Sequence, residues 1–308
     1  MKRRLILILL LFVLLTGCNN DPKASESNKN ASTEGSTSET IIYESENGPI
    51  EVPADPQRVV VLSSFAGNVL ALDVNLVGVD SWAKMNPQWE DELSAVEEVT
   101  DESLEKIIEL EPDLIIGLSN INNLDKLNEI APTVTFTYGA VDYLTQHLEI
   151  GKLLNKEEEA NNWVTDFKQR AQEAGDKIRA EIGEDTTVSV IESYDKQLYV
   201  YGDNWGRGTE ILYQEMDLKM PEKVVDAAQE AGYYALSAEV LPEFVGDYMI
   251  FSKFDEMDNS FTETETYKNI PAVANDRVFT VNGYEFYFND PLTLDYQLQF
   301  FKDAFLGE

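Results

Sequence analysis

Short apolar segments alternate with helical patterns along most of the chain. In the first half, segments suited to buried strands lie at residues 58–62, 76–80, 113–117 and 133–138, with helical patterns between them at residues 67–72, 100–111 and 126–130. This alternation is typical of a parallel, doubly wound sheet, because each crossover between parallel strands needs a helix that packs on the sheet. The sequence therefore predicts an α/β fold.

A long helical region interrupts this rhythm at residues 142–182, broken at most near Asn155. Small and apolar residues recur there at helical spacing: Ala160, Trp163, Val164, Phe167, Ala171, Ala174, Ile178 and Ile182. The α/β pattern then resumes, with strands expected at residues 187–191, 198–201, 247–252 and 277–281 and helices at residues 208–214 and 296–305. We expect two doubly wound lobes, at residues 41–140 and 184–308, joined by one stiff helical region at residues 141–183. Loops of both lobes would share a crevice, where ligands bind in such folds.

The first 40 residues read as a leader and a tether. Basic residues at positions 2–4 precede an apolar run over residues 5–15, which ends in the sequence LTGC. We predict a signal peptide at residues 1–17, too short for a comfortable membrane span. Cys18, the one cysteine of the chain, resembles the lipidated cysteine of bacterial lipoproteins, whose acyl chains anchor a protein to a membrane. Residues 18–40 are polar and predict a flexible tether.

The charge of the chain excludes some partners. It has 57 acidic against 23 basic side chains, a formal net charge of −34. Such a chain does not bind nucleic acid through its overall field and is repelled by anionic lipid. The lipid on Cys18 must therefore do the anchoring. We interpret the acidic surface as an adaptation to salty or alkaline surroundings.

The residues needed for common enzyme chemistry are scarce. His147 is the single histidine and lies in a helical pattern, where it is more often a packed residue than a base. The chain has no Gly-x-Ser-x-Gly elbow and no cysteine nucleophile beyond the leader, so acyl transfer lacks visible groups. One histidine cannot form a multi-histidine zinc site, and no carboxylate spacing matches a calcium loop. We expect a protein that is not an enzyme and supplies no metal ligands.

The stretch LYVYGDNWGRGTEILYQ, residues 198–214, places Trp205 and Arg207 among three glycines. The glycine spacing does not fit a phosphate loop, and Asp203 would oppose a phosphate. An indole face beside a guanidinium fork suits a bulky ligand with exposed oxygen acceptors. The glycines would then let the loop approach that ligand. Alternatively, Trp205 packs under the loop and Arg207 pairs with a carboxylate such as Glu210.

Further aromatic residues follow the expected strand ends. They are Trp82, Trp89, Tyr138, Tyr199, Tyr201, Tyr284, Phe286, Tyr287 and Phe288. In a crevice between lobes they would form an aromatic basin, although some must belong to the core. Strand alternation puts Tyr199 and Tyr201 on one face of the sheet without saying which face is wet.

Several stretches together resemble one family. These are the LTGC motif, the tether, EPDLIIGL (residues 111–118), the helical region, LYVYGDNWGRGTEILYQEMDLKM (residues 198–220) and YFNDPLTLDYQL (residues 287–298). They are similar to the ferric-siderophore-binding lipoproteins of ABC importers, specifically the hydroxamate-type receptors of Gram-positive bacteria. The resemblance covers nearly all of the chain after the leader. It implies a class III substrate-binding protein, a monomer held at the outer face of the cell membrane.

The resemblance also implies how the ligand is held. Fe³⁺ is a hard ion whose six sites are filled by hydroxamate oxygens, so the protein need not supply a ligand. Trp205 and Arg207 lie in the family's ligand-contacting motif, with Arg207 donating to hydroxamate oxygens. Tyr138, Tyr199, Tyr287 and Trp82 are the further contacts that the resemblance implies. It also implies a departure at Tyr287, where close relatives carry tryptophan.

Two glutamates are expected to meet the transporter. In the family, one glutamate on each lobe docks onto arginines of the membrane permease, which works with its ATPase. Glu105 and Glu239 match those positions. Either could also be an ordinary solvated charge.

Charge suggests which iron chelate is bound. Ferric tricatecholates are trianionic, whereas ferric trihydroxamates are neutral or cationic. Arg207 is the basic residue that stands out for the crevice of this acidic protein, with Lys84 as a second candidate. We expect ferrichrome-like or ferrioxamine-like ligands. The alternatives are a receptor of the same fold for a catecholate, citrate, haem or cobalamin, and a lipid-anchored enzyme.

Overall fold

The computed structural model describes residues 39–307. The predicted signal peptide at residues 1–17, Cys18 and nearly all of the tether lie outside the described residues. Within residues 39–307, no helix has the length and apolar character needed to cross a membrane.

The described chain opens with a hairpin that the sequence patterns did not indicate. Strands β1 (Thr40–Ser45) and β2 (Gly48–Pro53) pair antiparallel, with Thr40 opposite Pro53. Most residues of both strands are exposed or half-buried. Tyr43 and Val52 are buried and join the core of the first lobe, so the hairpin is packed onto that lobe.

The first lobe contains the parallel sheet that the alternating pattern predicts. Its strand order is β5-β4-β3-β6-β7, and every pair is parallel. The strands are β3 (Val59–Val61), β4 (Leu76–Val79), β5 (Glu97–Glu98), β6 (Leu114–Leu118) and β7 (Thr133–Phe136). Helices α1 (Ala66–Leu70), α2 (Ser81–Met85), α3 (Glu90–Leu93), α4 (Leu104–Glu109) and α5 (Leu124–Ile130) and the 3₁₀ turn η1 (Pro87–Trp89) lie between them.

Helices cover both faces of this sheet. Val59 and Val61 point into one core, together with residues of α1. Val60 points into a second core with Ile107 of α4 and Leu127 of α5. Successive residues of a strand face opposite sides, so the doubly wound arrangement is confirmed.

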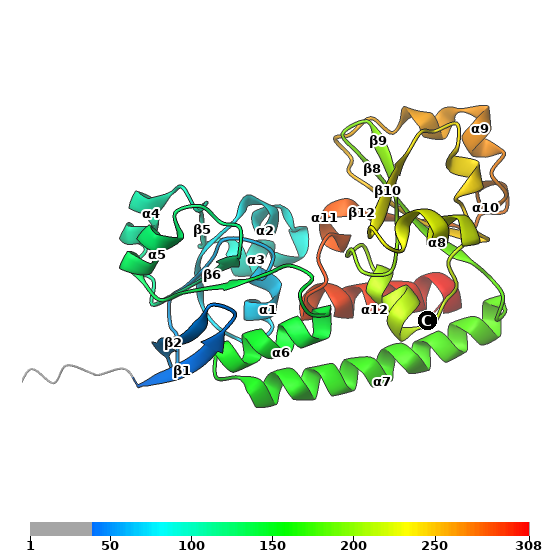
Figure 1. The fold of residues 1–308 in the computed structure, drawn as a ribbon. Helices are drawn as coiled ribbons and strands as arrows, with labels where there is room; N and C mark the ends of the chain where they lie inside the picture. Colours follow the sequence, from blue (N-terminus) through cyan, green and yellow to red (C-terminus); the bar gives the residue numbers. More distant parts are fainter. Residues whose placement is uncertain (1–38, 308) are drawn as a thin grey trace, which may run out of the picture. The chain divides into compact units, whose positions relative to one another are not determined.

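The helical region after the first lobe consists of two helices. Helix α6 (Tyr143–Leu153) begins at Asp142, whose side chain accepts from the backbone N–H groups of residues 144 and 145. It ends just before Asn155, and α7 (Glu157–Ile182) follows. With 26 residues, α7 is about 39 Å long at 1.5 Å per residue. The predicted long helix with a break near Asn155 is confirmed, and Figure 1 shows α7 running beneath the second lobe.

The second lobe is an α/β lobe with helices on both faces of its sheet, as expected, but the sheet is mixed and not parallel throughout. The strand order is β10-β9-β8-β11-β12. Strands β8 (Val188–Tyr194), β11 (Tyr248–Lys253) and β12 (Val278–Asn282) are parallel, whereas β9 (Gln197–Tyr201) and β10 (Tyr233–Leu236) are antiparallel to their neighbours. The reason is the two-residue link between β8 and β9, Asp195 and Lys196, both with positive φ. Such a link closes a hairpin and cannot make a parallel crossover.

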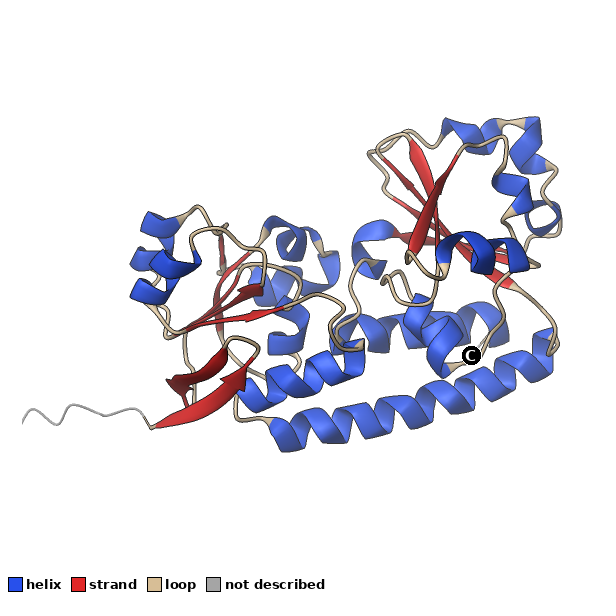
Figure 2. Cartoon of the chain, viewed as in Figure 1, coloured by secondary structure: helices blue, strands red, loops and turns tan. Residues whose placement is uncertain are grey.

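Further helical elements complete the second lobe; Figure 2 draws them in blue and the strands in red. They are the π-helix η2 (Glu210–Glu215), α8 (Glu222–Ala228), η3 (Leu241–Glu243), η4 (Ser260–Glu263), α9 (Glu265–Lys268), α10 (Pro271–Ala274), α11 (Gly283–Phe286) and α12 (Pro291–Leu306). Residues of α7 and α12 pack on one face of the sheet. Residues of α8 and α10 pack on the other.

The end of the chain forms a second connection between the lobes. Phe288 stacks on Trp89 of the first lobe with ring centroids 5.2 Å apart and belongs to that lobe's core. Asp290 caps α12 and packs on Gly67, where an added Cβ would overlap the Asp290 carboxylate. Helix α12 then packs along α7. The lobes are therefore coupled through this segment as well as through α6 and α7, which differs from the single strut that we expected.

Candidate functional site

The loop that follows β9 has an unusual backbone. Gly206, Arg207 and Gly208 have consecutive positive φ values of 70°, 59° and 82°. A Cβ on Gly206 would lie 2.5 Å from the carbonyl oxygen of Tyr287, and one on Gly208 would lie 2.6 Å from the ring of Phe301. These glycines let the loop pack against the protein's own C-terminal segment. The expectation that they make room for a ligand is therefore wrong for Gly206 and Gly208.

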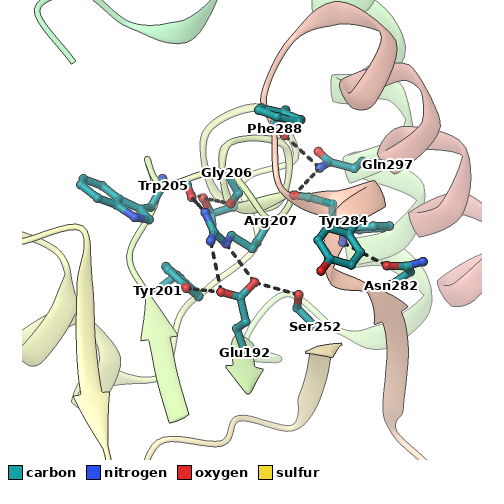
Figure 3. A network of polar contacts seen from close by, with 12 residues as sticks. Glu192, Tyr201, Trp205, Gly206, Arg207, Ser252, Asn282, Tyr284, Phe288 and Gln297 are labelled. Atoms are coloured by element: carbon teal, nitrogen blue, oxygen red, sulfur yellow. Dashed lines mark hydrogen bonds and ion pairs between the residues drawn. The ribbon is translucent and has the colours of Figure 1, made fainter. Parts of the chain in front are cut away.

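Arg207 forms a two-pronged ion pair inside the second lobe. Its Nε donates to Oε2 of Glu192 at 3.1 Å, and its Nη2 donates to Oε1 at 3.1 Å. Its Nη1 donates to the carbonyl oxygen of Trp205 at 3.1 Å. Figure 3 shows these contacts converging on the guanidinium. The partner is thus Glu192 of β8, not Glu210 as the alternative reading had it.

Glu192 accepts two more hydrogen bonds from its own sheet. The hydroxyl of Tyr201 donates to Oε1 at 2.7 Å, and the hydroxyl of Ser252 donates to Oε2 at 3.0 Å. The Glu192 residue is only 2% exposed. A buried carboxylate is tolerated only where donors and a cation satisfy it, and here four donors do so.

Aromatic rings enclose the arginine. The carbon at the centre of the guanidinium lies 4.3 Å from the ring centroid of Tyr287 and 4.9 Å from that of Tyr201. Burial opposes the charge of Arg207, but the adjacent Glu192 more than offsets this and raises the arginine pKa. The side chain is therefore a fixed cation that sits between two ring faces.

Glu210 has a different task from the one suggested by the sequence. Its Oε1 accepts from the backbone N–H of Gly206 and from Nδ2 of Asn289, both at 2.9 Å. Burial raises the pKa of this carboxyl group, against the effect of those hydrogen bonds. Glu210 thus fastens the loop to the segment before α12.

The other expected contacts gather around this loop. Trp205 makes an edge contact with Tyr138 of the first lobe at 6.0 Å between centroids and lies 5.3 Å from Tyr233. Tyr199 meets the same Tyr233 at 6.0 Å. Trp205 is half-buried and packs on Gly232, where an added Cβ would lie 2.6 Å from the indole. Part of its surface is therefore used for packing, as the alternative reading proposed, and part remains exposed.

Trp82 completes the set from the first lobe. It stacks on Tyr287 with centroids 4.4 Å apart and planes 16° from parallel, and it also contacts Tyr194 and Tyr284. The six expected ligand contacts thus form two sets. Trp82 and Arg207 both lie on the ring of Tyr287, whereas Tyr138 and Tyr199 are connected to Trp205, Tyr199 through Tyr233. The hydrogen bond from Arg207 to the carbonyl oxygen of Trp205 joins the two sets. We call Trp82, Tyr138, Tyr199, Trp205, Arg207 and Tyr287 the aromatic cleft.

A cavity of about 480 Å³ adjoins the aromatic cleft. Of the six cleft residues, Tyr138 lines it. The other polar lining residues are Ser64, Asn68, Asp142, Tyr143, Gln146, Asp203, Asn204, Glu210, Gln214 and Asn289. No lysine, arginine or histidine occurs among the described residues that line this cavity. Burial of the hydroxyl and the nearby Glu210 carboxylate raise the pKa of Tyr138 to about 12, so the phenol stays neutral in ordinary buffers.

Several other candidates lie elsewhere. Trp89, Phe286 and Phe288 are core residues. Lys84 donates to the carbonyl oxygens of residues 93 and 96 and so braces α2 and α3, which means that it is not a cleft cation. His147 is buried with Nδ1 3.1 Å from Oδ1 of Asn68, and burial lowers its pKa to about 4.

The two expected docking glutamates are exposed on different lobes. Glu105 lies in the first turn of α4. Glu239 lies in the turn between β10 and η3, and a hydrogen bond from Ser237 lowers its pKa. Their positions permit contact with a partner, and their role stays a prediction.

Sequence reasoning missed Glu192, Ser252 and Tyr233. Glu192 had a readable signal, because it directly follows the expected strand at residues 187–191, and a carboxylate buried in a sheet needs partners. Ser252 and Tyr233 carried no such signal. Their positions depend on the sheet order and on the antiparallel pairing of β10.

Comparisons with known proteins identify the family. The model of the periplasmic binding protein family matches residues 59–284. The chain is 34% identical over 305 residues to the iron(3+)-hydroxamate-binding protein FhuD of Bacillus subtilis strain 168, covering 96% of this chain and 95% of that protein. It is 32% identical over 318 residues to the iron(3+)-hydroxamate-binding protein YxeB of the same organism, with 99% and 98% covered.

Solved structures give the same result. FhuD2 from Staphylococcus aureus with bound ferrioxamine B superposes with a TM-score of 0.78 at 31% identity, covering 82% of this chain and 99% of that chain. The FhuD protein from S. pseudintermedius has a TM-score of 0.78 at 34% identity, with 88% and 99% covered. The resemblance to hydroxamate-type receptors, identified from the motifs, is confirmed.

Proposed function

The chain belongs to the periplasmic binding protein family, and we propose that it captures ferric hydroxamate siderophores and delivers them to an ABC permease for iron uptake. The observation that carries the proposal is the aromatic cleft, with one buried, fixed arginine at its centre. The ligand would be the iron complex itself, and the protein would bind it without a cofactor and without catalysis.

The chemistry of the cleft suits such a complex. The siderophore's hydroxamate oxygens surround Fe³⁺, so the protein meets an outer shell of carbon with a few exposed oxygens. Ring faces cover carbon, and the guanidinium donates to oxygen. The relatives that share this chain's full length are named for binding iron(3+)-hydroxamates, which supports the same ligand class.

Delivery requires anchoring and docking. In the proposal, lipid on Cys18 holds the monomer at the outer face of the membrane, and the polar tether lets the described body move above it. Glu105 and Glu239 would meet basic residues of the permease, one glutamate from each lobe. Replacing both with alanine should abolish uptake in cells while the dissociation constant of the purified protein stays the same. Uptake at the wild-type rate would contradict this part of the proposal.

The ligand class is tested by titration. Quenching of tryptophan fluorescence by ferrioxamine B, ferrichrome, ferric enterobactin, ferric citrate and haem would give a dissociation constant for each. Binding should change the fluorescence of Trp82 and Trp205, which belong to the aromatic cleft. We expect the two hydroxamates to bind about 100-fold more tightly than the others, because the adjoining cavity has acidic walls that oppose anionic chelates. Saturation by enterobactin, citrate or haem but not by either hydroxamate would contradict the proposed function.

A further inference from the structure

Glu192 controls how much of Arg207 a ligand can use. A guanidinium has five N–H donors. Glu192 takes one from Nε and one from Nη2, and the carbonyl oxygen of Trp205 takes one from Nη1. One N–H on Nη1 and one on Nη2 therefore remain for a ligand. The carboxylate fixes both the direction and the number of the donors that face the cleft.

Glu192 is itself held in place by the sheet. The hydroxyls of Tyr201 on β9 and Ser252 on β11 donate to its two oxygens. These strands flank β8, from which Glu192 rises. The carboxylate is therefore anchored from both sides, and Arg207 has little freedom to turn toward a different acceptor.

The same contact cancels the charge of the arginine. Arg207 and Glu192 are 9% and 2% exposed, so water screens neither charge well. Because their charged groups are hydrogen-bonded at 3.1 Å, a ligand meets the pair as a group without net charge. The neighbouring cavity adds Asp142, Asp203 and Glu210 and, among its described lining residues, no basic side chain. An anionic chelate would thus meet a site without a compensating cation.

We propose that Glu192 is the positioning residue for Arg207 and sets the charge selectivity of the cleft, so that neutral and cationic ferric hydroxamates are accepted and anionic ferric chelates are rejected. This inference rests on the proposed function. It assigns selectivity to a side chain that lies beneath Arg207 and is itself bonded to the sheet.

The decisive variant is Glu192→Gln, which keeps the shape of the side chain and removes its charge. Dissociation constants for ferrichrome, a neutral complex, and ferric enterobactin, a trianion, are measured by fluorescence quenching in the same buffer. Differences in ligand shape cancel when the ratio of the two constants is compared between variants. We expect the preference for ferrichrome to fall by about 10-fold or more, because the arginine charge becomes available to the anion.

Three further variants separate charge from position. Glu192→Asp keeps the charge but shortens the reach, so ferrichrome affinity should fall while the preference stays within about 3-fold of the wild type. The double variant Glu192→Gln with Arg207→Gln removes both charges, so it should bind ferrichrome weakly and restore the wild-type preference. Glu215→Gln is the matched control, a buried carboxylate of the same lobe that accepts from Tyr143. It should leave the preference unchanged within about 3-fold.

The outcomes are distinct. A wild-type protein that binds neither ferrichrome nor ferrioxamine B overturns the proposed function and this inference with it. A folded Glu192→Gln protein with the wild-type preference overturns the inference alone. If that variant does not fold, the double variant decides, because replacing both members of a buried pair is better tolerated than removing one. A double variant that rejects ferric enterobactin about 10-fold more strongly than the wild type would show that Arg207 had acted as an uncompensated cation, contrary to the proposal.

Discussion

The two sides of the aromatic cleft are built in different ways. The first lobe contributes Trp82 and Tyr138, whose rings come from the start of α2 and the loop after β7. Tyr138 is 47% exposed. The second lobe contributes a buried ion pair, bonded through Glu192 to three strands of one sheet.

This difference separates two tasks in ligand recognition. Ring faces give contact area with little demand on direction, so the first lobe can act as a cover. Charge-assisted hydrogen bonds depend on direction and need a rigid support. We infer that the second lobe determines which ligand binds, whereas the first lobe adds affinity for any chelate with a carbon shell.

The largest effect is expected from Arg207→Ala. It removes the two donors left for the ligand, so ferric hydroxamate affinity should fall by about 100-fold. It also leaves Glu192 buried without its cation, which should cost about 3–5 kcal/mol of unfolding free energy. Fluorescence titration and urea denaturation measure the two effects. Affinity equal to that of the wild type would show that the second lobe does not determine ligand binding.

Asp290, which lies where the two lobes meet, should make the unfolding free energy depend on pH. Burial raises the pKa of Asp290 to about 6, although hydrogen bonds from Thr293 and Leu292 oppose the shift. The unfolded chain has an ordinary carboxyl pKa near 4. Between about pH 4 and pH 6 the folded protein therefore holds the extra proton, and its stability falls as the pH rises.

Asp290→Asn keeps the helix cap and removes this titration. Relative to that variant, the unfolding free energy of the wild type should fall by on the order of 2–3 kcal/mol between pH 4 and pH 7. Urea denaturation of both proteins at several pH values measures the difference. A difference that does not change with pH would mean that Asp290 titrates normally.

Two glycines, one on each side of the cleft, allow the packing of the two backbones to be compared. Gly206, beside Arg207, and Gly139, beside Tyr138, both have positive φ, at 70° and 75°. A Cβ on Gly206 would lie 2.5 Å from a carbonyl oxygen, whereas one on Gly139 would meet nothing within 4 Å. Gly139→Ala should cost about 1 kcal/mol of unfolding free energy through its backbone alone, and Gly206→Ala at least about 1 kcal/mol more. Equal melting temperatures for the two variants would contradict the close packing of the second-lobe loop.

The smallest effect is expected on the first-lobe side. Trp82→Ala removes a stacked ring from the cleft, so affinity for ferrichrome and ferrioxamine B should fall by about 3–10-fold, and by similar factors for both. Tyr234→Ala is the control, because Tyr234 is 45% exposed and stacks on Phe244 away from the cleft. A loss for Trp82→Ala as large as that for Arg207→Ala would remove the distinction between the two sides.

Much of this architecture is readable from the sequence, and the omissions have physical causes. Periodicity indicates four of the five parallel strands of the first lobe, β3, β4, β6 and β7, and the helices α6 and α7, because these elements are strongly patterned or long. It does not indicate β5, which consists of the two exposed residues Glu97 and Glu98. It also does not indicate the hairpin of β8 and β9, because Lys196 follows Asp195 at the position where a two-residue turn usually has glycine.

The site shows the same limit. Trp205 and Arg207 are conspicuous on a glycine-rich stretch, so they can be named in advance. The partner of Arg207 cannot, because Glu192 is 15 residues away and approaches only through the pairing of β8 with β9. The loop residues Trp205 and Arg207 can be identified from the sequence, whereas the position of the Glu192 carboxylate next to Arg207 depends on the order of the strands in the sheet.

The most direct test is a crystal structure of the protein with ferrioxamine B bound. We predict that the complex lies against Trp82 and Trp205, with Nη1 and Nη2 of Arg207 within hydrogen-bond distance of hydroxamate oxygens and the pair with Glu192 intact. A complex bound away from Arg207, or an arginine that leaves Glu192 to reach the ligand, would contradict the account.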